Sequence, residues 1–334
     1  MTARILLTGG AGYIGSHTYL ALVEAGYEVV ILDSFANAAH DVPDRLAQIT
    51  GQPVSLFEVD VRDQSCLEQL FSAQNFDAVV HFAALKSVGD SCADPLGYMD
   101  CNLGGLIALM QAMAGNGIWN LVFSSSAAVY GAAKQLPIPE ATPLSAANPY
   151  GYTKLVGEQI LTQAAEAEPR WRHGVLRYFN PVGAHPSGLI GEDPNGVPAN
   201  LMPYIADVAR GKRDRVQVFG NDYDTPDGTG VRDYIHVMDL ARGHVLSLNA
   251  LLQQGQSHTV NLGTGRGYSV LEMVQAYAAA CGHDIPYDIA PRRAGDPAAS
   301  YADVTKAREA LGFEAELDLD DMCASSWNWV SRGP

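Results

Sequence analysis

Tyr150 and Lys154 stand four residues apart, where a helix is expected to begin after Asn148 and Pro149. This spacing places both side chains on one helical face, with Cβ atoms about 5–6 Å apart. A phenol has a reference pKa of roughly 10, and a nearby ammonium favours the phenolate. Reaching about 7 requires about 4 kcal/mol of differential stabilisation, to which we expect desolvation and a second cation to contribute. The pair therefore predicts a general base that works near neutral pH.

Three consecutive serines, at positions 124–126, follow the apolar run 121–123 upstream of this pair. We expect them to end a strand of a parallel sheet, at the edge where such sheets bind ligands. A hydroxyl at this edge can bond a substrate oxygen and relay a proton to Tyr150.

The first 33 residues predict a complete βαβ unit. Residues 4–8 and 28–32 are apolar runs typical of buried strands, and 16–25 predict the helix between them. The turn before the helix carries the pattern G-x-x-G-x-x-G, formed by Gly9, Gly12 and Gly15. Glycine lets the backbone approach a pyrophosphate closely, and the helix N-terminus attracts its charge. Asp33 ends the second strand, can accept bonds from ribose hydroxyls and would repel a 2′-phosphate, which predicts NAD rather than NADP.

Composition excludes several classes of protein. The chain has 334 residues, 47% apolar and 17% charged, which is typical of a well-packed soluble globule of one large domain or two. A net charge of −16 argues against nucleic acid and anionic membranes as partners. The five cysteines include no C-x-x-C, and the nine histidines show no H-E-x-x-H, so we expect free thiols and no metal. No apolar stretch approaches 18 residues and no leader precedes the first strand, so we expect a cytoplasmic protein.

Strands and helices are expected to alternate through the first half of the chain. Further strands are predicted at 54–59, 77–82, 121–124 and 174–178, and helices at 66–73, 96–114 and 150–166. This order predicts an α/β fold, a Rossmann-type doubly wound parallel sheet with helices on both faces. Glycine- and proline-rich loops follow residue 178. We therefore predict an NAD-binding domain at 1–180, rejoined by a segment near 233–248, and a smaller substrate-binding domain mainly at 181–334.

Motifs spread over nearly the whole chain carry a family resemblance. They are Thr8 to Thr18, His81 to Gly89, Phe123 to Gly131, Tyr150 to Lys154, Arg177 to Ala184, Asn200 to Ile205, Phe219 to Tyr223, Gly228 to Val237 and Pro291 to Asp296. The chain resembles the extended short-chain dehydrogenase/reductase superfamily and, within it, the UDP-glucose (UDP-galactose) 4-epimerases.

The resemblance implies a mechanism. Tyr150 takes the proton of the sugar 4-hydroxyl while the C4 hydride moves to the nicotinamide, whose positive charge further lowers the phenol pKa. The 4-keto sugar then turns over while its UDP stays anchored. Hydride returns to the opposite face, Tyr150 returns the proton, and NAD is regenerated as a tightly held cofactor. Lys154 also holds the nicotinamide ribose, and Ser126 is the hydroxyl beside the base.

The resemblance also assigns binding positions. Besides the three glycines, the NAD positions are Tyr13, Ile14, Asp33, Asn37, Asp60, Val61, Phe82, Ala83, Lys86, Ser124, Tyr150, Lys154 and Phe179. The substrate positions are Lys86, Ser126, Tyr150, Asn180, Asn200, Leu201, Phe219, Arg232, Arg293, Asp296 and Ser300. Two arginines suit a diphosphate, and Asp296 suits ribose hydroxyls. By spacing alone, Asn180, Asn200 and Asp296 could equally be loop caps.

Ser300 occupies a position where some relatives carry a tyrosine that crowds the sugar C2 substituent. Serine leaves room there, so we hypothesise that the chain also interconverts UDP-GlcNAc and UDP-GalNAc, unless other residues refill the space. Alternatives are another UDP-sugar enzyme of the superfamily (a dehydratase, decarboxylase or reductase) and a non-catalytic NAD-sensing regulator. Dehydratases carry an acidic pair where Ala127 and Ala128 stand, and regulators tend to lose the Tyr/Lys pair. Relatives form dimers, for which helices 96–114 and 150–166 are the candidates here.

Overall fold

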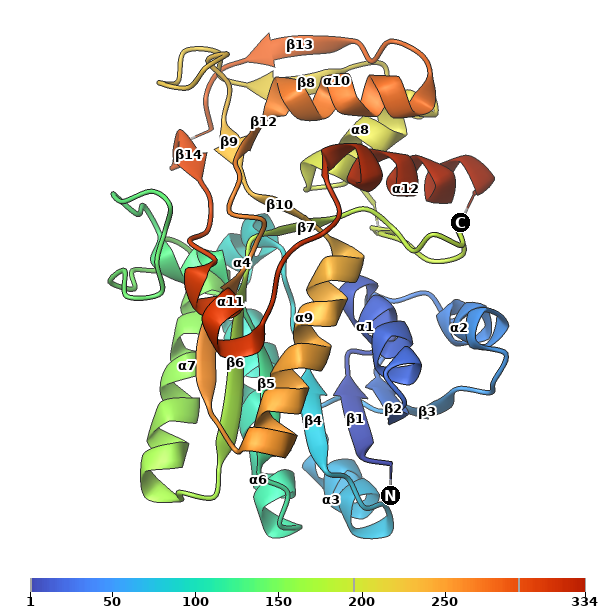
Figure 1. The fold of residues 1–334 in the computed structure, drawn as a ribbon, viewed down its shortest axis with the longest axis vertical. Helices are drawn as coiled ribbons and strands as arrows, with labels where there is room; N and C mark the ends of the chain where they lie inside the picture. The colour runs from blue at the N-terminus through green and yellow to red at the C-terminus, as the bar shows by residue number, and fades with distance from the viewer. Residues whose placement is uncertain (1, 195, 294, 334) are drawn as a thin grey trace.

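The computed structural model describes residues 2–194, 196–293 and 295–333. Its main sheet has seven strands, all parallel, in the order β11-β6-β5-β4-β1-β2-β3 (Figure 1). Their bounds are β1 Arg4–Thr8, β2 Glu28–Asp33, β3 Ser55–Glu58, β4 Ala78–His81, β5 Asn120–Ser126, β6 Arg172–Tyr178 and β11 His258–Leu262. The predicted doubly wound α/β fold is thereby confirmed, and the bounds of the predicted strands lie within two residues of the observed ones.

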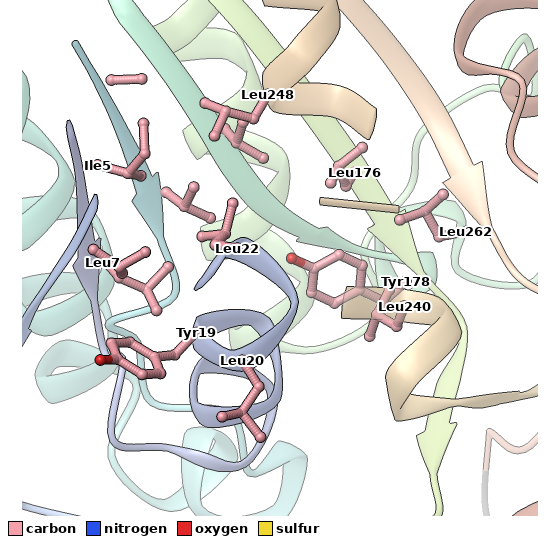
Figure 2. Close-up of a cluster of buried hydrophobic side chains, with 14 of the residues drawn as sticks. Ile5, Leu7, Tyr19, Leu20, Leu22, Leu176, Tyr178, Leu240, Leu248 and Leu262 are labelled. Carbon is pink, nitrogen blue, oxygen red and sulfur yellow. The ribbon is translucent and has the colours of Figure 1, made fainter. Parts of the chain in front are cut away.

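Successive strand residues point to opposite faces of this sheet, and each face has its own apolar core. Ile5 and Leu7 of β1 pack on one side, with α1 (Tyr13–Glu24), α2 (Val42–Thr50), α9 (Val237–Asn249) and α11 (Thr305–Leu311). Figure 2 shows this core, in which Tyr19, Leu20 and Leu22 of α1 accompany Leu240 and Leu248 of α9. Leu6 packs on the other side, with α3 (Gln64–Ala73), α6 (Gly105–Gly115) and α7 (Pro149–Ala167). Both faces are covered, so the strands read as continuous apolar runs.

The single helix predicted over 96–114 is broken in the structure. It comprises α5 (Pro95–Met99), a π-helical segment (Asp100–Gly104) and α6, preceded by α4 (Val88–Ala93). Asp94 caps α5 by accepting a hydrogen bond from the Gly97 backbone N–H at 2.9 Å. In the π segment, the Asn102 side chain accepts from Leu85 N at 2.8 Å and donates to Leu85 O at 3.0 Å. The wider turn thus joins the helix to the loop after β4, as π segments do near functional sites.

A second region stands beyond the carboxyl ends of the main strands (Figure 1). It has three small sheets: β7 (Asn180–Val182) with β10 (Tyr234–His236), β9 (Val231–Arg232) between β12 (Tyr268–Ser269) and β14 (Ala299–Ser300), and β8 (Val216–Phe219) with β13 (Tyr287–Ala290). Helices α8 (Leu201–Ala209), α10 (Val270–Cys281) and α12 (Leu319–Arg332) enclose its own apolar core. Short 3₁₀ and π segments lie at Ala127–Tyr130 and Ala250–Gln254.

The chain returns from this second region to the main sheet in two ways. Helix α9, which covers most of the segment near 233–248, packs against α1. This is the segment that was expected to rejoin the first domain. Strand β11, from residues assigned by sequence to the second domain, adds the seventh strand beside β6. None of the helices in the described residues combines the length and apolarity needed to cross a membrane.

Candidate active site

The Tyr150–Lys154 pair lies in the first turns of α7. The Asn148 side chain caps this helix by accepting a hydrogen bond from Gly151 N at 2.8 Å. Lys154 is only 5% exposed, and its Nζ donates to Ser124 Oγ at 3.2 Å. The same Nζ lies 6.0 Å from the centroid of the Tyr150 ring. The structure therefore places the tyrosine and lysine together, beside the serines that end β5, as the spacing predicted.

The electrostatics of this pair differ from expectation. Burial raises the pKa of Tyr150, and the contribution that opposes burial comes from a hydrogen bond with Ser126. Burial also lowers the pKa of Lys154 to about 8. Desolvation disfavours the charged form of both groups, so its direction at Tyr150 is the reverse of what the sequence analysis assumed. In the chain alone the phenol is protonated at neutral pH.

The glycine loop packs so closely against other backbone that side chains would not fit at two of its positions. Gly9 has φ of 70°, and a Cβ on it would lie 2.6 Å from Ala83 N, at the start of the loop after β4. A Cβ on Gly15 would overlap the Gly9 carbonyl oxygen. Helix α1 starts after Gly12, and no side chain caps its first N–H groups. These features suit close approach of a phosphate to the helix N-terminus.

Asp33 connects the second strand to this loop. Its side chain is buried and accepts hydrogen bonds from Ala11 N and Phe35 N, both at 2.9 Å. Burial is the main cause that raises its pKa, against the opposing backbone hydrogen bonds. A compact glycine-rich loop, an uncapped helix and an adjacent buried carboxylate fit a dinucleotide with free ribose hydroxyls.

The remaining predicted cofactor positions follow the same edge of the sheet. Asp60 bonds Arg62, with 2.6 Å between Oδ2 and Nη2, and this pairing holds the carboxyl pKa low. Phe82 packs against His244, with 4.8 Å between ring centroids. Several others differ in exposure: Val61 and Phe179 are buried, Tyr13, Ile14 and Ala83 are partly buried, and Asn37 is exposed.

Most of the predicted substrate residues lie in the second region, whereas Lys86, Ser126 and Tyr150 lie at the edge of the main sheet. Arg232 and Ser300 are register partners on adjacent strands, so these two positions are fixed side by side. Asp296 lies 3.8 Å from Arg232, measured from Oδ1 to Nη2. The Arg293 guanidinium lies over the Phe219 ring, 3.9 Å from its centroid.

Three further substrate positions lie at junctions between elements. Asn180 opens β7, and its N–H donates to Asp233 O at 3.0 Å. Asn200 precedes α8, of which Leu201 is the first residue. Lys86, in the loop after β4, lies 3.6 Å from Oε1 of Glu192.

Sequence reasoning missed two carboxylates and one amide that organise this site. Asp233 is fully buried, and its oxygens accept from the backbone N–H groups of residues 264, 265 and 302. Asn102, besides its bonds to Leu85, donates to Thr153 Oγ1 at 2.9 Å, next to Lys154. Glu192 contacts both Lys86 and Asn200. Asp233 follows Arg232 directly, which was a usable signal, whereas Glu192 lies in a glycine- and proline-rich loop that offered none.

No group of three or more His, Cys, Asp or Glu residues in the described part of the chain is arranged to hold a metal ion. The parallel sheet, the glycine loop and the Tyr–Lys pair together define an extended short-chain dehydrogenase/reductase. Residues 6–326 match the family model described as GDP-mannose 4,6 dehydratase.

Comparison with individual proteins gives a narrower assignment. The chain is 53% identical to the UDP-glucose 4-epimerase of Bacillus subtilis (strain 168), over 98% of this chain and 96% of the relative. It is 51% identical to that of Homo sapiens, over 100% and 98%. The crystal structure of the Bifidobacterium longum UDP-glucose 4-epimerase with NAD⁺ and UDP superposes with a TM-score of 0.95 at 53% identity, covering 99% of each chain. The chain belongs to the UDP-glucose 4-epimerase family.

Proposed function

We propose that this chain interconverts UDP-glucose and UDP-galactose by inverting C4 of the sugar, with NAD as its cofactor. The observation that carries the proposal is the full-length identity of about half with UDP-glucose 4-epimerases, in a chain that has Tyr150 and Lys154 together. A solved relative from Stenotrophomonas maltophila, 51% identical with a TM-score of 0.97, contains NAD and formylated UDP-arabinopyranose. The cofactor and the UDP-linked substrate class follow from these relatives.

The glycine loop and the N-terminus of α1 are proposed to hold the pyrophosphate of NAD, and Asp33 a ribose. Lys154 and Ser124, which are already bonded to each other, are placed to hold the ribose nearer the reaction. When bound, the nicotinamide supplies the acceptor and donor of the hydride at C4 of the sugar.

Tyr150 is proposed to hold and move the proton. Desolvation raises the pKa of its phenol, so it reaches the anionic form only after further positive charge enters the site. It then accepts the proton of the sugar 4-hydroxyl at its Oη and returns the same proton at the end of the cycle. Lys154 is buried beside the phenol, and a bound sugar and nicotinamide would exclude the water that could exchange with the proton and screen the charges.

The second region is proposed to anchor UDP during this exchange. Phe219 offers an aromatic face to the base, and Arg232 and Arg293 suit a diphosphate. In the chain as it stands, Arg232 lies near Asp296 and Arg293 covers Phe219, so both contacts have to rearrange around a ligand. An anchored UDP leaves the sugar free to present either face to the same reaction centre.

The dehydratase alternative gains no support from the site, although the family model has that description. Ala127 and Ala128 directly follow Ser126, in the short 3₁₀ turn after β5. Neither has a side chain able to act as an acid or base at C5 and C6 of a sugar. The Tyr/Lys pair is present, which disfavours a non-catalytic regulator.

The proposal is tested with Tyr150→Phe, which removes the hydroxyl and keeps the ring. We expect kcat on UDP-galactose to fall by at least about 10² while UDP still binds. Tyr152→Phe is the matched control, because Tyr152 lies two residues further along α7 and is exposed. Near-normal turnover in Tyr150→Phe would refute its role, and deuterium at C4 that is lost to solvent would refute internal hydride return.

Homodimerisation is a further proposal, which the exposed apolar residues of α4 to α7 support. Leu96 is 79% exposed, and Val88, Ile107 and Tyr152 are exposed as well. Helices α4 and α5 both contact α7, so these side chains occupy neighbouring elements. Contiguous exposed apolar residues mark interaction surfaces.

We also propose the cytoplasm as the compartment, since all five cysteines are free thiols.

A further inference from the structure

Glu192 is held rigidly at the boundary between the two regions. Its carbonyl oxygen accepts a hydrogen bond from Trp329 Nε1 of α12 at 3.2 Å. The preceding residue, Gly191, forms an antiparallel bridge with Ala184. Two separate contacts therefore hold the backbone at Glu192, one with α12 and one with Ala184.

One oxygen of Glu192 serves two residues from different regions. Oε1 accepts from Asn200 Nδ2 at 2.8 Å and lies 3.6 Å from Lys86 Nζ. Lys86 follows a strand of the main sheet, whereas Asn200 precedes α8 in the second region. The Glu192 side chain is 11% exposed and that of Lys86 is 65% exposed, so the carboxylate is the more enclosed partner.

The negative charge of Glu192 also acts on Tyr13, which directly follows the glycine loop. Burial first and the Glu192 carboxylate second raise the pKa of Tyr13, whose hydroxyl donates to Gly183 O at 2.7 Å. A carboxylate so close to the proposed sites of two anionic ligands would repel both if it stood alone. Its contacts with an ammonium and an amide offset that repulsion, and in return they fix where Lys86 and Asn200 lie.

We propose that Glu192 is a positioning residue for UDP-sugar binding, which aligns Asn200 and Lys86 through a single carboxylate oxygen. This inference rests on the proposed function, because Asn200 and Lys86 are substrate positions there. Glu192 touches the ligand-binding residues and takes no part in proton transfer. Its loss therefore weakens UDP binding and raises KM, while kcat at saturating substrate is largely retained.

The experiment compares Glu192→Gln with Asp193→Asn in the full-length protein purified with its cofactor. Both variants remove one carboxylate charge, from adjacent residues, and Asp193 is exposed. We expect Glu192→Gln to weaken UDP binding, measured by calorimetry, by about 5- to 10-fold, the difference between a charged and a neutral hydrogen bond. Its KM for UDP-galactose should rise by a similar factor, while its kcat stays within about twofold of the wild-type value. Asp193→Asn should behave as wild type.

A double-variant cycle with Asn200→Ala identifies the partner. Glu192→Gln should weaken UDP binding by a smaller factor when Asn200 is already alanine, because only the contact with Lys86 is then left to lose. The inference would be overturned by wild-type UDP affinity in Glu192→Gln. It would also be overturned by an equal loss of affinity in Asp193→Asn, or by the same loss in both Asn200 backgrounds. If Glu192→Gln does not fold, the Asn200→Ala variant alone decides, because unchanged UDP affinity there would overturn it. Calorimetry with UDP needs no turnover, so absence of epimerase activity in the wild type would refute only the proposed function.

Discussion

Replacing Lys154 by methionine should change the pH dependence of stability in a calculable way. The ammonium is buried, which lowers its pKa from 10.5 to about 8. The folded state therefore holds this proton less tightly than the unfolded chain does, so charged Lys154 destabilises the fold. Lowering the Lys154 pKa from 10.5 to about 8 costs about 3 kcal/mol of folding stability below pH 8. This cost disappears as the pH rises to 10.5.

The expected observable is the difference in free energy of unfolding between wild type and Lys154→Met. Between the two pKa values the unfolded chain binds more protons, so wild-type stability rises with pH relative to the variant. From pH 7 to pH 10 the difference should move by about 2–3 kcal/mol in favour of wild type. The hydrogen bond to Ser124, which methionine also loses, adds an offset that does not create this trend.

Urea unfolding followed by circular dichroism, on protein freed of nucleotide, measures this difference at each pH. Lys134→Met is the matched control, because Lys134 is exposed and its charge is not buried by folding. Other titrations are shared by both proteins and cancel in the comparison. A difference that stays constant within about 0.5 kcal/mol from pH 7 to 10, or moves towards the variant, would refute a buried charged Lys154.

Three further changes probe other parts of the structure. Arg177→Met should destabilise the fold by about 3–5 kcal/mol in urea unfolding. It leaves the buried Glu158 carboxylate, which lies 2.6 Å from Arg177 Nη2, without its cationic partner. Adding Glu158→Gln to the same chain should recover part of the lost stability. Ser300→Tyr should reduce turnover of UDP-GlcNAc more than that of UDP-glucose, because serine leaves room for the C2 substituent. Equal, negligible UDP-GlcNAc turnover in wild type and variant would refute the hypothesis that the chain also converts N-acetylated substrates. Leu96→Glu should shift the sedimentation coefficient from dimer to monomer, and an unchanged value would place the interface elsewhere.

The strands of the first domain were predictable because burial on both faces leaves a plain signal. The run at 28–32, for example, became β2, extended by one residue to Asp33. The two-residue strands β9, β12 and β14 carry no such signal, since pairing between distant segments creates them. Strand β11 was not predicted, because its five residues lie within the part of the chain assigned to the second domain, and only pairing with β6 adds them to the main sheet.

The candidate site divides in a similar way. Tyr150 and Lys154 could be placed from their spacing, because a helix fixes which residues share a face. Their pKa values could not be predicted, since burial by the surrounding structure sets them. Glu192 was missed because its partners, Lys86 and Asn200, come together only when the two regions pack.

The position of β11 in the sheet has a consequence for synthesis on the ribosome. Strand β6 is translated about 80 residues before its outer neighbour, β11. At about 5–20 residues per second, that delay is about 4–16 s. Throughout this interval the nascent chain presents one unpaired backbone edge, the kind of surface that recruits strands from other molecules. A chaperone that shields this edge during elongation would protect the yield of native protein without contacting the mature enzyme.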